Sequence, residues 1–175
     1  MKHNTKYFAH LGVLSALAII ISTVETLMPP IFPLLPYARL GLANCIVLFA
    51  VISIGSKEGL FILLTKSFFS AIFSGNPTSL LYSLSGGLAS LGIMLLLIIL
   101  KKNSVTAISC MGGVLHNIGQ LIVASLITLS VAPLALTPYM IFLGGISGSV
   151  TGLLCHVIIK RLFSNGGIKD FNKNL

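Results

Sequence analysis

The sequence contains few charged residues. Lysine, arginine, aspartate and glutamate together make up only 8% of the 175 residues, against roughly 25% in a typical soluble domain. A chain with so few charges cannot cover the surface of a soluble protein. Because 55% of the residues are hydrophobic and the mean hydropathy is +1.04, the composition predicts an integral membrane protein.

Acids, cysteines and nucleotide-binding motifs are also scarce. The only acids are Glu25, Glu58 and Asp170, with no acidic pair of the kind that holds Mg²⁺. No GxxxxGK[ST] loop occurs, so any nucleotide hydrolysis must come from another chain. The three cysteines lack CxxC spacing, which argues against a disulfide framework and a metal site. We therefore expect no catalytic residues, no metal site and no cofactor.

Breaks in the hydrophobic pattern divide the chain into six apolar segments. They fall at paired prolines, at "GSKEG", "SGNPT" and "KKNS", and at "APLALTP", where proline, glycine and polar residues end helices. The first segment is too long for a signal peptide and lacks a small-residue cleavage site, so we expect it to be retained. The prediction is a single all-α domain, 1–175, with six transmembrane helices over residues 8–28, 39–55, 58–74, 78–100, 105–130 and 138–162 and a basic tail over 163–175.

Basic residues indicate how these spans are oriented. If both termini are cytoplasmic, nine basic residues lie at cytoplasmic ends, Arg39 alone lies in an outer loop, and Lys66 lies within a span. The positive-inside rule therefore predicts a multi-pass protein of the plasma membrane with both termini in the cytoplasm. The net charge of +8 then reports topology, so nucleic acid is not expected as a partner. The nine residues are Lys2, Lys6, Lys57, Lys101, Lys102, Lys160, Arg161, Lys169 and Lys173.

Small residues recur at helical spacing in two spans. Gly144, Gly148 and Gly152 share one face of the last span, and Gly12 and Ala16 form a shorter stripe on the first. Small residues at this spacing let helix backbones approach closely in lipid. Contact within the bundle is the default expectation for such stripes, and docking of a partner subunit is the alternative.

Polar side chains gather in the outer half of the predicted bundle. The stretch "GGVLHNIGQLIVAS" alone places an imidazole and two amides near mid-membrane. A charged side chain at the bilayer centre costs at least ~2.5–3.5 kcal/mol, so Lys66 needs a partner or water. We predict a ligand pocket open to the outside, suited to anionic or carbonyl oxygens. Its residues are Glu25, Arg39, Asn44, Lys66, Ser70, Ser85, His116, Asn117 and Gln120.

Structural roles are the alternatives for some of these residues. Asn44 and Gln120 could each act as hydrogen-bonding contacts between helices, worth about 0.6 kcal/mol on average. Glu25 could form an ion pair with Arg39 across the mouth of the pocket. For Lys66 and His116 we favour a functional role, because ionisable residues within membranes mark functional sites by default.

Three motifs carry a family resemblance. "RLGLAN" (Arg39–Asn44), "SLSGGLAS" (Ser83–Ser90) and "HNIGQLIVAS" (His116–Ser125) resemble the heptaprenyl diphosphate synthase component I family, also called the Gx transporter family. The resemblance covers approximately residues 8–162. It implies a six-helix fold similar to the substrate-binding S components of energy-coupling-factor (ECF) transporters, with "PPIFPLLPYARLG" as a lid. It also implies that Gly12 and Ala16 dock on a coupling subunit that works with ATPases.

Two functions remain open at this point. The first is a transporter subunit that captures a small anionic or amphiphilic ligand, such as a vitamin, flavin or isoprenoid, in an outward-facing pocket. The second is a non-catalytic accessory subunit of heptaprenyl diphosphate synthase, anchored in the lipid bilayer. An ion-coupled carrier is a third alternative, but the sequence has no internal repeat or paired acid to support it. In none of these functions do we expect this chain itself to be an enzyme.

Overall fold

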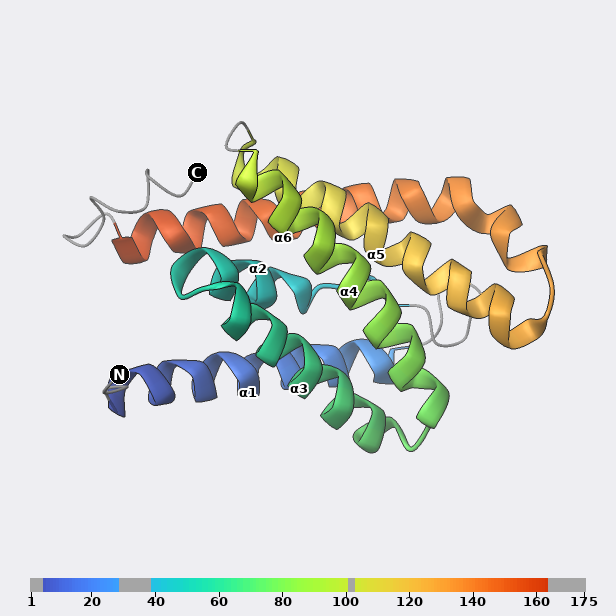
Figure 1. Ribbon diagram of the computed structural model, residues 1–175, viewed down its shortest axis with the longest axis horizontal. Coiled ribbons are helices and arrows are strands. Elements are labelled where there is room, and N and C mark those ends of the chain that lie inside the picture. The colour runs from blue at the N-terminus through green and yellow to red at the C-terminus, as the bar shows by residue number, and fades with distance from the viewer. Residues whose placement is uncertain (1–4, 29–38, 101–102, 164–175) are drawn as a thin grey trace.

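The computed structural model describes residues 5–28, 39–100 and 103–163, and every regular element in this part of the chain is a helix (Figure 1). The all-α prediction is therefore confirmed. The elements are α1 Thr5–Leu27, α2 Asn44–Ser53, α3 Ser56–Ser74, α4 Pro77–Ile99, α5 Val105–Thr128, the 3₁₀ helix η1 Ala132–Leu136, and α6 Thr137–Phe163.

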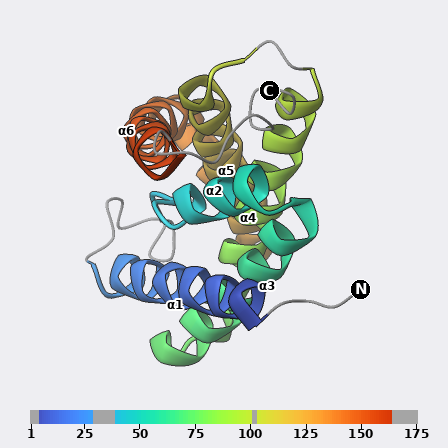
Figure 2. The ribbon, with the colours of Figure 1, turned by 90° about the vertical axis from the view of Figure 1, so that its left-hand side faces the viewer.

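Successive helices run in alternating directions, so the start of α1 and the end of α6 lie at the same end of the molecule (Figure 1). The most extensive packing joins α5 to α6 and to α4, while α1 lies on the other side of the molecule against α3. Between these two sides lies α2, which contacts all five other α-helices (Figure 2). No residue of α2 is exposed.

Four helical segments in the described part of the chain are long and apolar enough to cross a membrane. They are Tyr7–Leu27, Pro77–Ile99, Val105–Thr128 and Ala132–Arg161. The six α-helices lie where six spans were predicted, but α2 begins at Asn44 rather than at residue 39. The predicted start was wrong because Gly41 adopts a positive φ of 77°, which a helix does not continue through. The ten residues of α2 rise only about 15 Å, half the thickness of a hydrocarbon core.

Local sequence signals explain where the longer helices begin and end. At the start of α4, the Asn76 side chain accepts a hydrogen bond from the backbone N–H of Thr78 (3.0 Å), and Pro77 occupies the first turn. The preceding helix ends at Gly75, which has a positive φ of 63°. Ser104 caps α5 in the same way as Asn76 caps α4, by accepting from the N–H of Ala107 (3.2 Å).

The glycine stripe on α6 packs within the bundle, as predicted. A Cβ added to Gly144 or to Gly148 would lie only 2.5 Å from a backbone oxygen of α5, that of Gly113 or Ser109 respectively. These glycines therefore bring the two backbones together without intervening side chains. Gly145, on the next face of α6, has no such contact, because its added Cβ would meet atoms only at 4.0 Å.

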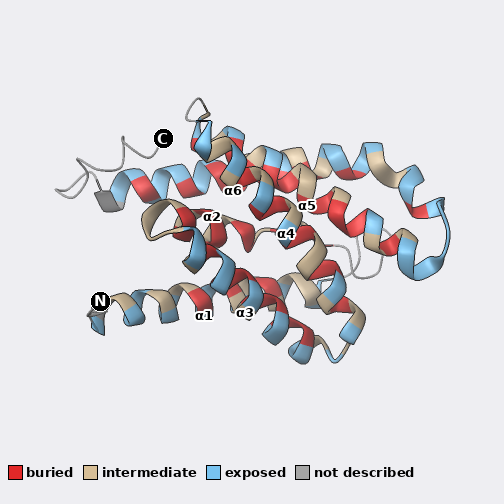
Figure 3. Ribbon diagram, viewed as in Figure 1, coloured by how far each residue is buried: buried red, intermediate tan, exposed pale blue. Residues whose placement is uncertain are grey.

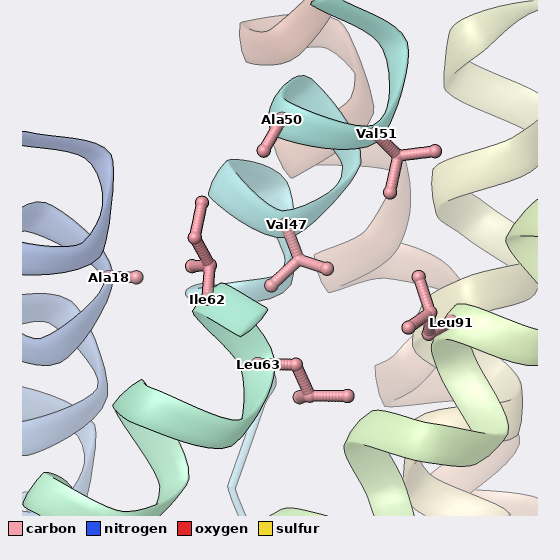
Figure 4. Close-up of a cluster of buried hydrophobic side chains, with 7 residues drawn as sticks. All are labelled: Ala18, Val47, Ala50, Val51, Ile62, Leu63 and Leu91. Atoms are coloured by element: carbon pink, nitrogen blue, oxygen red, sulfur yellow. The ribbon is translucent and has the colours of Figure 1, made fainter. Parts of the chain in front are cut away.

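Apolar side chains fill the interior at the end of the molecule where α1 begins and α6 ends, and they also cover its outside. Exposed positions lie along the outer faces of the helices (Figure 3). Many of them are large hydrophobic residues, as expected for a surface in contact with lipid. One buried cluster joins α1, α2, α3 and α4 (Figure 4), and a second joins α2, α4, α5 and α6. The residues drawn in Figure 4 are Ala18, Val47, Ala50, Val51, Ile62, Leu63 and Leu91.

Candidate functional site

Buried polar side chains meet in the middle of the helix bundle. Arg39 is 7% exposed, and Lys66 and His116 are each 2% exposed. On α5, this polar layer lies between buried Ile108 on one side and buried Leu121 on the other, each part of an apolar cluster. The sequence prediction that polar groups from separate helices converge is therefore realised among the described residues.

Arg39 lies in the non-helical segment before α2 and extends its guanidinium between three helices. Its Nη1 donates to the hydroxyl oxygens of Ser22 on α1 (3.1 Å) and Ser70 on α3 (3.0 Å). Its Nη2 donates to the hydroxyl of Ser79 on α4. A buried cation is thus held by neutral hydroxyl oxygens from three helices, which compensate its charge less completely than a carboxylate would.

A continuous chain of polar contacts runs from Lys66 to the backbone of Arg39. Lys66 Nζ lies 2.8 Å from Asn44 Oδ1, and Asn44 Nδ2 lies 3.1 Å from His116 Nδ1. On the other side of the imidazole, His116 Nε2 lies 3.0 Å from Gln120 Nε2. Gln120 Oε1 then accepts from the backbone N–H of Arg39 (3.1 Å). These four contacts join α3, α2, α5 and the segment that leads into α2.

Two glycines hold the His116 ring from opposite sides. A Cβ added to Gly41 would lie 2.8 Å from His116 Cδ2, and one added to Gly86 would lie 2.7 Å from His116 Nδ1. Gly41 comes from "RLGLAN" and Gly86 from "SLSGGLAS", while His116 begins the third motif. The three motifs, far apart in sequence, therefore meet around one imidazole ring.

Glu25 supports the start of α2. Its two carboxylate oxygens accept hydrogen bonds from the backbone N–H groups of Leu42 (2.9 Å) and Ala43 (3.4 Å). N–H groups at a helix start lack intrahelical partners and favour a negative charge. Although both side chains are described, Glu25 makes this contact instead of the ion pair with Arg39 that the sequence left open.

In the part of the chain that the structure describes, two predicted site residues, Ser85 and Asn117, take no part in the chain of contacts, in the binding of the Arg39 guanidinium or in the support of α2. The hydroxyl of Ser85 donates to the carbonyl of Tyr82 in its own helix (3.2 Å). Asn117 Nδ2 donates to the carbonyl of Met140 on α6 (2.8 Å), and its Oδ1 is buried without a partner among the described residues. The remaining seven predicted residues belong to the cluster or, for Glu25, to its support.

Sequence reasoning missed two contributors, Ser22 and Ser79. Both hydroxyls bind the guanidinium of Arg39, and both side chains are almost fully buried. A weak signal existed for Ser22, because Ser15, Ala18 and Ser22 recur at helical spacing and share the buried face of α1. For Ser79, which occupies the first turn of α4, the sequence offers no comparable signal.

The proposed docking stripe faces outward. Gly12 and Ala16 are exposed on α1, and a Cβ added to Gly12 would meet nothing within 4 Å. Most of the predicted lid, residues 29–38, and the basic tail, residues 164–175, lie outside the described residues.

The comparisons with known proteins identify the family. No curated protein matches the chain. A family model described as heptaprenyl diphosphate synthase component I matches residues 14–158, which include all nine predicted site residues and the whole polar cluster. The chain therefore belongs to the heptaprenyl diphosphate synthase component I family.

Proposed function

We propose that this protein is the membrane-embedded, substrate-binding subunit of a transporter, similar to the S components of ECF transporters. It captures a small anionic or amphiphilic ligand, of the vitamin, flavin or isoprenoid type, from the outer side of the membrane. The observation that carries this proposal is the polar cluster in which Arg39 and Lys66 are buried among neutral partners from separate helices.

The energetics of burial favour a binding role over a purely structural one. Contacts between helices can be made by amides and hydroxyls at low cost, whereas buried cations require strong compensation. Glu25, the carboxylate near the cluster in the described part of the chain, is engaged by backbone N–H groups. An anionic ligand supplies the missing negative charge, so that the two buried cations are compensated when the ligand is bound.

The outer face of α1 supports a transport assembly. Its stripe of Gly12 and Ala16 is exposed, which leaves it open to the coupling subunit that the proposal requires. Since the sequence has no nucleotide-binding loop, the energy comes from partner ATPases. In this proposal both termini face the cytoplasm, and the cluster is reached from the opposite side.

Mass spectrometry of purified protein tests the proposal. The protein is extracted in a maltoside detergent, which contains no phosphate, and small molecules that co-purify are identified and counted. We expect Arg39→Gln to reduce the amount of bound ligand at least about tenfold, because charge-assisted hydrogen bonds are worth roughly 1.5–3 kcal/mol. Ser85→Ala is the matched control, since the Ser85 hydroxyl bonds the Tyr82 carbonyl of its own helix and takes no part in the cluster formed by the described residues. Recovery of no ligand, or equal recovery from both variants, would contradict the proposal.

A second function has specific support from the family. The description "component I" implies a partner subunit, so the chain could instead anchor a soluble prenyl diphosphate synthase at the membrane. With three acids in the whole sequence, this chain would then be an accessory subunit and not the catalytic one. Affinity purification from native membranes separates the two functions. ATPases and a coupling subunit support transport, whereas a prenyl synthase supports the accessory role.

A further inference from the structure

The chain of contacts from Lys66 to Arg39 has an unusual feature in its hydrogen-bonding groups. Its two ends are a lysine Nζ and a backbone N–H, and a charged lysine and a backbone N–H can both only donate. Between them lie Asn44, His116 and Gln120. Each of these three, with a neutral imidazole, presents one donor and one acceptor to the chain.

Counting acceptors shows that the chain is one short. Four contacts require four acceptors, and the three central side chains supply three. The shortage does not depend on which way the two amides are turned, because turning an amide exchanges its donor and acceptor without adding either. A doubly protonated His116 would make the shortage larger. With Lys66 charged, one contact must therefore join two donors.

The position of this mismatch follows from the side-chain orientations. Asn44 directs Oδ1 to Lys66 and Nδ2 to His116, so when Nδ1 of the imidazole accepts from Asn44, Nε2 carries the proton. Gln120 directs Oε1 to the backbone N–H of Arg39, so its own Nε2 amide group faces the protonated His116 Nε2 at 3.0 Å. In this tautomer, the two donors meet between His116 and Gln120.

Two changes would remove the mismatch. If Lys66 is neutral, its lone pair supplies the fourth acceptor. Asn44 then turns its amide over and His116 carries its proton on Nδ1, while Gln120 keeps the orientation that accepts from the backbone N–H of Arg39. Alternatively, Lys66 stays charged and an added oxygen accepts from both His116 and Gln120. An unpaired buried donor costs more than a typical hydrogen bond gains, so a state that satisfies every donor is favoured over the mismatch.

The charges around Lys66 also favour a neutral Lys66 in the empty cluster. Within residues 5–28, 39–100 and 103–163, the charged or titratable groups that interact with Lys66 are Glu25 from α1, Arg39 from the segment before α2, and His116 from α5. The residue after Lys66, Ser67, bonds the hydroxyl of Ser83 on α4 (2.8 Å). With Arg39 and Glu25 both charged, the empty cluster is electrically neutral only when Lys66 is neutral. A bound anion restores neutrality when Lys66 is charged.

We propose that the cluster binds an oxyanion group, such as a phosphate or carboxylate, and that one proton is taken up by Lys66 when it binds. An oxygen of the ligand accepts hydrogen bonds from His116 and Gln120, and the imidazole changes from its Nδ1–H to its Nε2–H form. This inference rests on the proposed function, because it specifies the ligand of the same site. In this proposal Asn44, His116 and Gln120 couple the protonation of Lys66 to the binding of the ligand oxygen.

Nitrogen-15 NMR of protein labelled at histidine and lysine tests the empty state. We expect His116 protonated on Nδ1 and a neutral Lys66 amine in ligand-free protein at neutral pH. Signals are assigned by their loss in His116→Gln and Lys66→Gln variants. A Lys66 ammonium signal in the empty protein would overturn the inference. This test does not depend on the identity of the natural ligand.

Titration calorimetry in two buffers of different ionisation enthalpy tests the bound state. The probes are inorganic pyrophosphate and, separately, farnesyl diphosphate, so that a free oxyanion and a lipid-borne one are distinguished. Binding of either with uptake of about one proton supports the inference. The Lys66→Gln variant provides a permanent acceptor but no cation, so we expect weaker binding, and we expect the binding that remains to proceed with proton uptake near zero.

The failures of the two proposals are distinguishable. Diphosphate binding without proton uptake would overturn the inference and leave the proposed function intact. If the co-purified ligand has no oxyanion group and neither probe binds, the inference is likewise overturned and the proposed function remains intact. An absence of any ligand would remove the proposed function and the binding step together, whereas the NMR result on the empty chain would still stand.

Discussion

Replacing Gly86 with alanine tests whether the His116 ring is held as tightly as the structure indicates. Gly86 lies on α4, and an added Cβ would be 2.7 Å from His116 Nδ1 and 2.8 Å from the His116 carbonyl oxygen. Ordinary van der Waals contact begins at 3.4 Å. The ring and the backbone of α5 must therefore both move away from α4, and the ring cannot move without changing its contacts with Asn44 and Gln120.

The expected cost combines three contributions. Overpacking a well-filled interior typically costs about 1–3 kcal/mol. Lengthening the contacts of His116, now 3.1 Å and 3.0 Å, costs roughly 0.5–1.5 kcal/mol for each bond that is lost. Alanine in a helix gains about 0.5–1 kcal/mol over glycine, which offsets part of this. We expect a net destabilisation of about 1–5 kcal/mol, with the upper part of this range reached when both contacts are lost.

Equilibrium unfolding in mixed detergent micelles, at increasing mole fraction of dodecyl sulfate, measures the difference. Gly92→Ala is the matched control, because it lies on the same helix and its added Cβ would meet nothing within 4 Å. We expect this control to be neutral or more stable by about 0.5–1 kcal/mol. If both variants unfold at the same denaturant fraction, the tight packing of Gly86 against His116 is refuted.

Three further substitutions test the packing and the cluster by the same assay. Gly148→Ala should cost about 1–3 kcal/mol by forcing α6 from α5, whereas Gly145→Ala should be tolerated; equal effects would contradict the close approach. Ser22→Ala should cost about 1–3 kcal/mol by leaving a guanidinium donor unpaired, whereas Ser15→Ala removes a buried hydroxyl with no partner among the described residues and should be neutral. Asn76→Ala should cost about 1 kcal/mol by removing the cap of α4, and Asn76→Ser should restore most of it; a neutral Asn76→Ala would exclude the cap as a source of stability.

Most helix positions could be predicted because their ends carry local chemistry. "SGNPT" contains both the left-handed Gly75 and the capping Asn76, so the turn between α3 and α4 is encoded within a few residues. The start of α2 was predicted wrongly for the opposite reason. Apart from Arg39, "RLGLA" is as apolar as a helix in lipid. Whether the helix starts before or after Gly41 depends on how this segment packs against the His116 ring.

The convergence of polar side chains could be predicted because cations and amides are rare in apolar helices. Their individual partners could not be predicted. Hydroxyls within spans often bond their own helix, as Ser53 does, so residue type alone does not separate Ser22 or Ser79 from these. The partner of Glu25 depends on where the backbone of residues 42–43 passes, which is a property of the folded chain and not of sequence spacing.

The shortness of α2 has a consequence for biogenesis. Ten residues wrapped by five neighbours cannot be held in the bilayer by their own length, so their retention depends on the helices around them. We expect α2 to enter together with α3 as a hairpin and to settle only after α5 and α6 have been synthesised. Because α2 carries Asn44 and follows Arg39, the polar cluster would be completed only at the end of maturation, once the last helix has left the ribosome.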